Sequence, residues 1–207
     1  MLSLLGKSSS INVRKVLWTC TEIGVEYHHE EYGAGALSLS TDAFLALNPN
    51  GMVPVIKDDD FILWESNSIC RYLAAKHHRD DLLPTDPQQR AKVEQWMDWQ
   101  ATELNNSWRY AFMALVRHSP AHVDRSAIET SISNWNHHMK ILDTQLVKTG
   151  AYVTGENFSL ADIVLGLSTH RWIMTDMEKP QLPAIAAYYE LLSQQPAFLL
   201  HGRNGMP

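Results

Sequence analysis

Three serines stand side by side at Ser8, Ser9 and Ser10, directly before a segment whose apolar residues have helical spacing. A hydroxyl at such a place either satisfies backbone groups of the turn and helix start or donates a hydrogen bond to a bound ligand. Asn12, two positions after Ser10, brings a side-chain amide to the same helix start. Neither the types nor the spacing decides which of these polar groups does chemistry.

A second candidate site lies at "WESNSICRYL", where a strand is expected to end and a helix to begin. Ser66 is predicted as the N-cap of that helix, whose free N–H groups and positive dipole end suit a carboxylate. Glu65 beside it could receive an ammonium group. Together, the two residues could hold both charged ends of an amino-acid group; the alternative is an ordinary cap next to a surface glutamate.

A third candidate is "NPNGMVPVI", in which Asn-Pro and Asn-Gly form turns that lead into a strand predicted to begin at Val53-Pro54. A proline at the start of a strand cannot donate to the sheet and leaves neighbouring backbone groups free for another partner. The simpler interpretation is a turn that enters an edge strand.

The elements that must position these residues fall into two groups. The first ~80 residues have the order β-α-β followed by β-β-α, with a helix at 11–23 stopped by Gly24 and a hairpin around Asp58–Asp60. From Pro87 on, only helices are predicted: from Asp86-Pro87 to about 118, from about 124 to 148, and two more near the C-terminal end. Ser159 and Asp162 form a capping box at the start of one of them.

Composition excludes several functions. The formal net charge is −6, from 17 Lys+Arg against 23 Asp+Glu, and no basic block indicates nucleic-acid binding. No apolar run approaches the ~18 residues of a membrane span, and the apolar start is too short for a signal peptide. Two cysteines outside any CxxC favour a reduced, cytoplasmic protein, and the three histidine pairs lack metal-ligand spacing, so no metal is expected.

In this order and spacing, "SSSINVRKV", "NPNGMVPVI", "ESNSICRYL" and "FSLADI" resemble the cytosolic glutathione transferases, in particular bacterial serine-type members similar to the theta, phi and nu classes. The resemblance implies an α/β plus all-α protein: a thioredoxin-like glutathione-binding domain at 1–79, a linker at 80–86 and an all-helical bundle domain at 87–207. It also implies a homodimer that uses glutathione as co-substrate.

The resemblance also implies roles for single residues. Ser10, six positions before Val16, would donate a hydrogen bond to the glutathione thiolate, and Asn12 would share or take over that role. The bond before Pro54 would be cis, and Val53 would pair with the cysteinyl unit. The expected glutathione-binding residues are Ser9, Met52, Val53, Pro54, Glu65 and Ser66, and the expected electrophile-pocket residues are Trp108, Arg109, Phe112 and Trp172.

Met52 departs from the pattern, because many relatives have Lys or Gln there and methionine cannot pair with the glycyl carboxylate.

The expected activity is conjugation of the glutathione thiolate to small apolar electrophiles, as in detoxification. The alternatives are a glutathione-dependent disulfide reductase or peroxidase on the same scaffold, which the Ser10-Ile11-Asn12 arrangement also permits, and a non-catalytic dimeric ligand-binding protein. Isomerisation of a small ketoacid is less favoured, since the typical SSC motif is replaced by "SSI".

Overall fold

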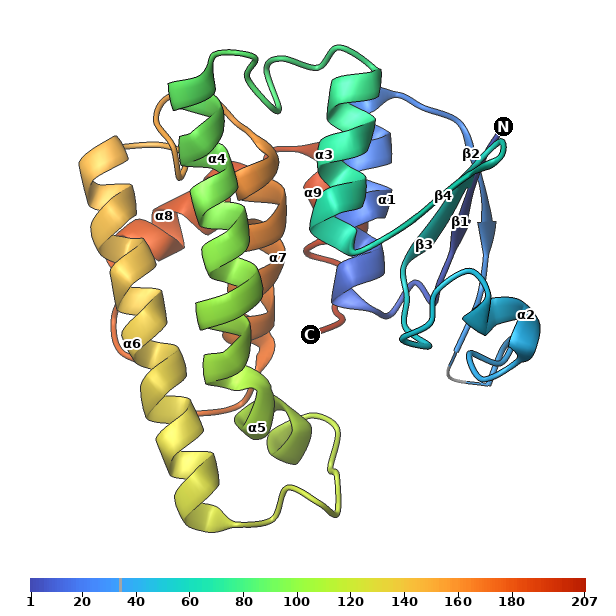
Figure 1. The fold of residues 1–207 in the computed structure, drawn as a ribbon. Helices are drawn as coiled ribbons and strands as arrows, with labels where there is room; N and C mark the ends of the chain where they lie inside the picture. The colour runs from blue at the N-terminus through green and yellow to red at the C-terminus, as the bar shows by residue number, and fades with distance from the viewer. Residues whose placement is uncertain (34) are drawn as a thin grey trace.

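The structure is a computed structural model that describes residues 1–33 and 35–207. Its first part is a mixed four-stranded sheet with helices on both faces (Figure 1). The elements of this part are β1 (Leu2–Leu5), α1 (Ile11–Ile23), β2 (Tyr27–Glu30), α2 (Asp42–Leu45), β3 (Val55–Asp58), β4 (Phe61–Trp64) and α3 (Ser66–Lys76). The strand order is β2-β1-β3-β4, with β1 parallel to β2 and antiparallel to β3.

Alternation along the strands explains why both faces of the sheet are covered. Leu4 and Ile56 face one another across β1 and β3 and join the main core with α1 and α3. The next pair, Leu5 and Val55, points to the other face and packs with Phe44 of α2 in a smaller core. Successive strand residues point to opposite faces, so four-residue strands suffice to build two layers.

The second part is helical. Its elements are α4 (Pro87–Trp99), a π-helical turn (Gln100–Leu104), α5 (Asn105–Leu115), α6 (Arg125–Thr149), α7 (Leu160–Met174), α8 (Pro183–Leu192) and α9 (Pro196–His201). The helix predicted from Pro87 is therefore continuous to Leu115 apart from the π-helical turn. No helix among the described residues is long and apolar enough to cross a membrane.

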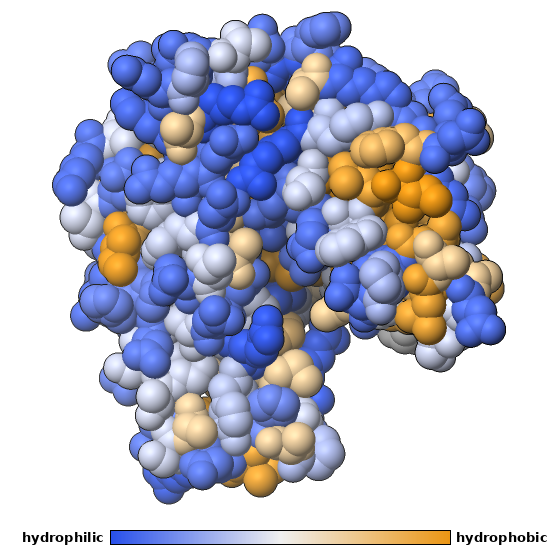
Figure 2. Space-filling view, in the orientation of Figure 1, coloured by the Kyte–Doolittle hydropathy of each residue, from blue (hydrophilic) through white to orange (hydrophobic). Residues whose placement is uncertain are grey.

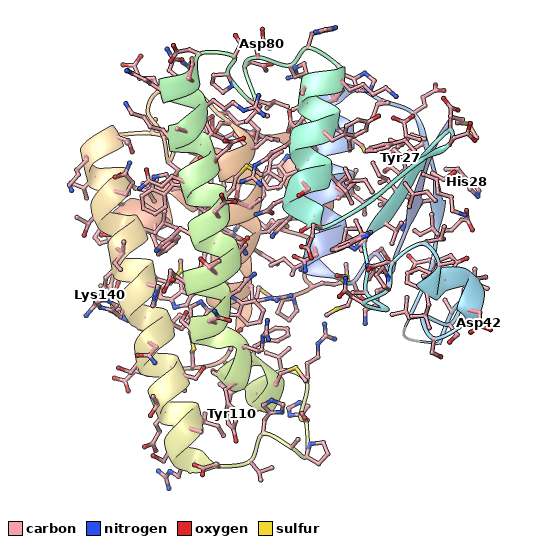
Figure 3. All side chains as sticks on the ribbon, in the orientation of Figure 1. Tyr27, His28, Asp42, Asp80, Tyr110 and Lys140 are labelled. Atoms are coloured by element: carbon pink, nitrogen blue, oxygen red, sulfur yellow. The ribbon has the colours of Figure 1, made fainter. Side chains whose placement is uncertain are left out.

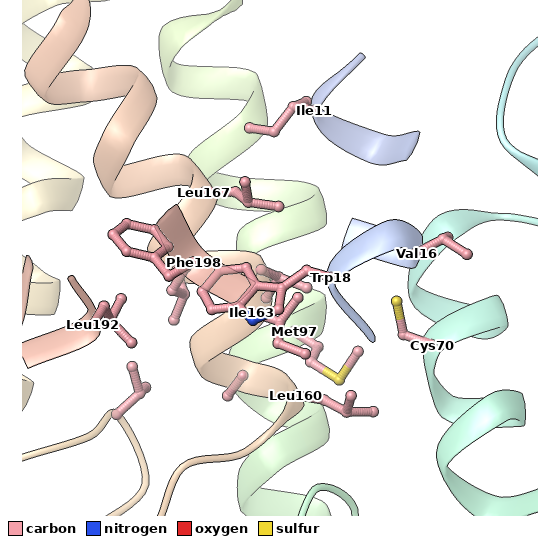
Figure 4. Packing of buried hydrophobic residues seen from close by; sticks show 14 of the residues in the cluster. Ile11, Val16, Trp18, Cys70, Met97, Leu160, Ile163, Leu167, Leu192 and Phe198 are labelled. Atoms are coloured by element: carbon pink, nitrogen blue, oxygen red, sulfur yellow. The ribbon is translucent and has the colours of Figure 1, made fainter. Parts of the chain in front are cut away.

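The two parts share one hydrophobic core, at whose centre lies Trp18 of α1 (Figure 4). Its ring packs against Phe198 of α9 at a centroid distance of 5.1 Å. Gly166 allows the close approach of α7, because a Cβ at this position would lie 3.1 Å from the Trp18 ring and 2.7 Å from Leu192. Helix α1 therefore packs both against the sheet and against the helices of the second part.

The structure confirms the predicted fold class, a thioredoxin-like part followed by a helical part. Local stop and start signals also hold: Gly24 ends α1 in a left-handed conformation, Asp86 caps α4, and Ser159 with Asp162 forms a capping box. Three details differ. Helices α2 and α9 were not predicted, since four and six residues are too few for a periodic pattern. Strand β3 begins at Val55, after the proline, rather than at Val53.

Candidate active site

A cavity of about 470 Å³ lies where the starts of α1 and α3 meet the π-helical turn and α5. Both parts of the chain contribute to its wall. The lining residues are Asn12, Lys15, Asn48, Asn50, Met52, Val53, Pro54, Glu65, Ser66, Asn67, Ser68, Arg71, Asp98, Ala101, Asn105 and Arg109. Seven predicted site residues are among them, brought together from four segments of the sequence.

A larger cavity of about 840 Å³ lies elsewhere, near the segment that connects α3 to α4. It is lined by Asp80, which lies at the opposite end of the molecule from Tyr110 of α5 (Figure 3). None of the predicted site residues lines this cavity. The smaller cavity is therefore the candidate active site.

The three serines before α1 differ in exposure and in hydrogen bonding. Ser8 is exposed, and its backbone N–H donates to the Glu31 carboxylate at 3.1 Å. Ser10 is the N-cap residue of α1, and its half-buried hydroxyl has no hydrogen-bond partner among the described residues. Asn12 lines the cavity, whereas Ser9 and Ser10 do not. The Ser10 hydroxyl is therefore free to donate, and its place in the site stays a prediction.

The turn before β3 is held by its own amide side chains. Asn48 is buried and donates from Nδ2 to the Met52 carbonyl at 2.8 Å, while its Oδ1 accepts from the Asn50 backbone N–H at 3.0 Å. The Val53–Pro54 peptide bond is cis, as the resemblance implied. Met52, 62% exposed, lies on the rim of the cavity and offers no charge there.

The start of α3 corrects one sequence prediction. Glu65, not Ser66, is the N-cap residue, and Ser66 is the first residue of the helix. Glu65 has φ +73°, which is unfavourable for any residue with a Cβ, and its side chain is exposed at the cavity. This conformation places Glu65 and the buried Ser66 next to one another at the positive end of the α3 dipole. Such strain is frequent at functional sites.

Lys15 is a site residue that sequence reasoning missed. It lines the cavity yet is 1% exposed, and its ammonium donates to Gln100 Oε1 at 2.7 Å and to Asn67 Oδ1 at 3.2 Å. Burial, and to a smaller extent the nearby charge of Arg171, lower the Lys15 pKa to about 8. Both hydrogen-bond partners are neutral amides, so this cation remains available to an anionic ligand group.

Two further charges stand on the wall between the two parts of the chain. Arg71 of α3 forms an ion pair with Asp98 of α4, and both residues line the cavity. With Glu65 and Lys15, they give the cavity charges of both signs. Binding of a zwitterionic amino-acid group by Glu65 and Ser66 stays a prediction.

The four residues predicted for the electrophile pocket are dispersed. Arg109 lines the cavity and is exposed. Trp108 and Phe112 are buried in the core with their rings in edge contact, one turn apart on α5. Trp172 is turned toward α6, where its indole N–H donates to Asn136 Oδ1 at 2.9 Å. Any part these residues take in binding an electrophile stays a prediction.

The buried cysteines and the histidines add no further reactive site to this cavity. Cys20 and Cys70 are free and buried, and burial raises the pKa of Cys20 to about 12 and that of Cys70 to about 11. Such thiols are poor nucleophiles, because the thiolate is the reactive form. Within 1–33 and 35–207, no group of three or more His, Cys, Asp or Glu side chains is arranged to hold a metal ion.

A thioredoxin-like sheet with a cis-proline, joined to helices that close one side of the cavity, defines a class of proteins that bind thiol peptides. Residues 9–76 match the family model "Glutathione S-transferase, N-terminal domain". The chain is 37% identical over 201 residues to the Escherichia coli K12 protein "Glutathione S-transferase GstB", covering 95% of each. It belongs to the glutathione S-transferase family and is an enzyme of that family.

Solved structures agree with this assignment. The theta class glutathione S-transferase from Xanthomonas axonopodis pv. citri, with glutathione bound, superimposes with a TM-score of 0.90 at 35% identity, over 97% of this chain and 96% of that one. A second curated relative, "Glutathione S-transferase 1" from Manduca sexta, is 31% identical over 157 residues, which are 74% of this chain and 70% of the relative.

Proposed function

We propose that the protein conjugates the thiolate of glutathione to small electrophiles that have an apolar body. The observation that carries this proposal is the cavity itself: donors at the start of α1, the cis-proline turn and the charged start of α3 line one space of about 470 Å³. Its charges of both signs suit a peptide with a zwitterionic end. The chain division proposed with it is 1–79, 80–86 and 87–207.

The thiolate is proposed to form at the start of α1, next to Ser10 and Asn12. A free thiol has a pKa of ~8.5, so lowering it by ~2 units requires ~2.7 kcal/mol. One hydrogen bond to a charged acceptor contributes ~1.5–3 kcal/mol and a helix N-terminus ~0.3–2 kcal/mol. The first turn of α1 has no acidic residue to oppose this effect, so the two contributions suffice without a metal.

The γ-glutamyl end is proposed to lie at the start of α3. Its ammonium group would face Glu65, and its carboxylate would accept from Ser66 and the free N–H groups of the helix. Lys15 lies behind this position, and its unpaired charge favours the same carboxylate. The cysteinyl unit would pair with the backbone of Val53, with Pro54 and Ser9 beside it. Met52 would touch the glycyl end without an ion pair.

A homodimer formed through the edge of the sheet is also proposed, in a cytoplasmic protein with a role in detoxification. Figure 2 shows a large apolar area over the part of the surface where β3 and β4 lie. Phe61, Ile62 and Trp64, all from the edge strand β4, are 37–46% exposed. Contiguous apolar area on an edge strand favours a protein partner, here a second copy. Sedimentation of Phe61→Ser against the unchanged protein tests this contact.

The activity is tested by following glutathione conjugation to an aryl halide next to glutathione-dependent reduction of a model disulfide. Conjugation well above the uncatalysed rate supports the proposal. Disulfide turnover with negligible conjugation would assign the protein to the reductase or peroxidase alternative. Absence of glutathione binding at millimolar concentration would instead favour a non-catalytic ligand-binding protein.

A further inference from the structure

Three arginines, from α1, from α7 and from the turn after α5, lie near one another beside the candidate active site. Arg14 of α1 is 1% exposed, and Arg171 of α7 is 3% exposed. Arg117, just after the end of α5, is exposed to solvent. Each is close enough to the others for its positive charge to count, since the charges of Arg14 and Arg117 both act on Arg171.

Among the described residues, no Asp or Glu side chain pairs with Arg171 or Arg117. The Arg14 guanidinium donates to the Met206 carbonyl at 2.8 Å, to Asn204 Oδ1 at 3.2 Å and to a main-chain oxygen of Pro207, the last residue of the sequence, at 3.3 Å. The Arg171 guanidinium makes no hydrogen bond within the described chain, and its Nε is buried without a partner. Burial and the neighbouring cations lower the pKa of Arg14 to about 10 and that of Arg171 to about 9.

Aromatic rings contact the guanidinium of Arg171. Its Cζ lies 4.1 Å from the Phe112 ring centroid and 4.6 Å from that of Trp108. The Cζ of Arg117 also lies over Phe112, at 5.4 Å. Rings that contact the plane of a guanidinium fix its orientation but leave the N–H groups along its edge unmatched. The fork of donors that binds a carboxylate is therefore positioned and unused.

The cluster adjoins the site where glutathione is proposed to bind. Trp108 donates from Nε1 to Asn105 Oδ1 at 3.1 Å, and Asn105 lines the cavity. Burial first, and the charge of Arg171 in addition, lower the pKa of Lys15, which lines the same cavity. Arg171 therefore lies close to the wall of the cavity, on the side of α5 rather than on that of the cis-proline turn.

A buried charge is normally paired, because removal of an ion from water is costly. Arg171 and Arg117 have no Asp or Glu partner in the described part of the chain and lie beside a substrate cavity, which is accounted for if the substrate supplies the anion. We infer that the electrophile carries a carboxylate, which pairs with Arg171 and Arg117 while its apolar body lies in the adjoining cavity. This inference rests on the proposed transferase function and names the substrate class of that site.

The test compares two electrophiles that differ only in charge, 4-(bromomethyl)benzoate and 4-(bromomethyl)benzamide. In both, the glutathione sulfur forms a bond to the benzylic carbon, the carbon–bromine bond breaks and bromide leaves with its electron pair. The carboxylate takes no part in the bond changes. Each kcat/KM is divided by the rate constant of the same uncatalysed reaction. We expect this ratio to be about 10-fold or more higher for the benzoate than for the benzamide, which is the effect of one charged hydrogen bond.

Arg171→Met and Arg117→Met should each lower kcat/KM for the benzoate by roughly 10- to 100-fold and change that for the benzamide by less than about 3-fold. Arg125→Met is the matched control, since Arg125 is 92% exposed at the start of α6 and pairs with Glu129. It should alter neither value. Arg117 is itself exposed, so its variant tests the inference even where Arg171→Met does not fold.

Equal use of both electrophiles by the unchanged protein, or equal losses for both in the two variants, would overturn the inference. A rise in KM for glutathione with either electrophile would assign the arginines to a glutathione carboxylate and overturn it as well. Failure of the proposed function looks different, because then neither electrophile is turned over faster than in the uncatalysed reaction.

Discussion

The Lys15 ammonium donates a hydrogen bond to Gln100 Oε1 at 2.7 Å, so the first helix of the sheet part is joined to the π-helical turn of the helical part. Gln100 extends the hydrogen-bond network, since its Nε2 donates to Asn105 Oδ1 and to Ser168 Oγ. A buried polar network of this kind fixes the positions of its members when all of them are satisfied. It holds the cation of Lys15 at the floor of the cavity.

Lys15→Met keeps the length of the side chain and removes its charge. We expect Kd for S-methylglutathione, whose sulfur cannot titrate, to rise by roughly 10-fold or more, which is the effect of a lost charged hydrogen bond. Calorimetric titration measures this change. Lys140→Met is the control, because Lys140 is exposed on the outer side of α6 (Figure 3). Equal affinity of the Lys15 variant and the unchanged protein would remove Lys15 from the binding site.

Lys15 also predicts how the stability of the protein depends on pH. The Lys15 pKa is about 8 in the folded protein against 10.5 for a free lysine, so the unfolded chain binds more protons between these values. The free energy of unfolding contributed by Lys15 therefore rises with pH across this window, by on the order of 3 kcal/mol. Urea unfolding of the unchanged protein and Lys15→Met, compared at each pH, isolates this contribution. A constant difference between them would contradict the lowered pKa.

Ser10 and Asn12 compete for the role of thiolate donor. Ser10→Ala is expected to raise the pKa of the bound glutathione thiol by about one unit or more, since it removes a charged hydrogen bond. Ultraviolet absorbance of the thiolate, followed against pH, measures that pKa. Asn12→Ala is measured beside it, and Ser8→Ala serves as the control. If the pKa moves only in Asn12→Ala, the amide that lines the cavity is the main donor.

Sequence patterns predicted the fold because its signals are local. Gly24 stops α1 and Asp86 caps α4, each by backbone geometry that a few neighbouring residues determine. The cavity could be predicted only through the resemblance to a family, since its walls come from segments at 12–15, 48–54, 65–71 and 98–109. Their meeting depends on how the helices pack against the sheet, which no local pattern contains.

The buried cations were missed for the same reason. In "INVRKVLW", Arg14 and Lys15 read as the polar face of an amphipathic helix, yet both are 1% exposed. Helix α1 has no polar face, because α3, α7 and α9 surround it. The burial of Arg171, near the end of α7, was missed for the same reason. A charged residue inside a helix that is buried on all sides can be recognised only once its neighbours are known.

Glu65 predicts a conflict between stability and binding. Its φ of +73° costs a residue with a Cβ about 1–2 kcal/mol, which glycine avoids. Glu65→Gly is therefore expected to be more stable than Glu65→Ala by about 1 kcal/mol, while both lose the carboxylate and bind glutathione more weakly. Urea unfolding and glutathione titration of the two variants test this. An alanine variant as stable as the glycine variant would show that the backbone relaxes.

Asp162 joins the start of α7 to two distant segments. Its fully buried carboxylate accepts from the backbone N–H groups of Val153 and Ser159 at 2.9 Å and from the Tyr188 hydroxyl at 3.1 Å. Burial outweighs these hydrogen bonds and raises the pKa of Asp162 to about 6. The folded protein therefore binds more protons than the unfolded chain between pH 3.8 and about 6.

The contribution of Asp162 to stability is therefore complete below pH 3.8 and is lost as pH rises through about 6. Compared with Asp162→Asn, the unchanged protein should lose on the order of 3 kcal/mol of relative stability over this range. Urea unfolding from about pH 4.5 to about pH 8 covers the decisive part. Ser159→Ala should cost about 1 kcal/mol, as the loss of a cap does, and more where Asp162 is ionised, because the Ser159 hydroxyl donates to that carboxylate at 3.1 Å. A relative stability that rises with pH would mean that hydrogen bonds, and not burial, dominate at Asp162.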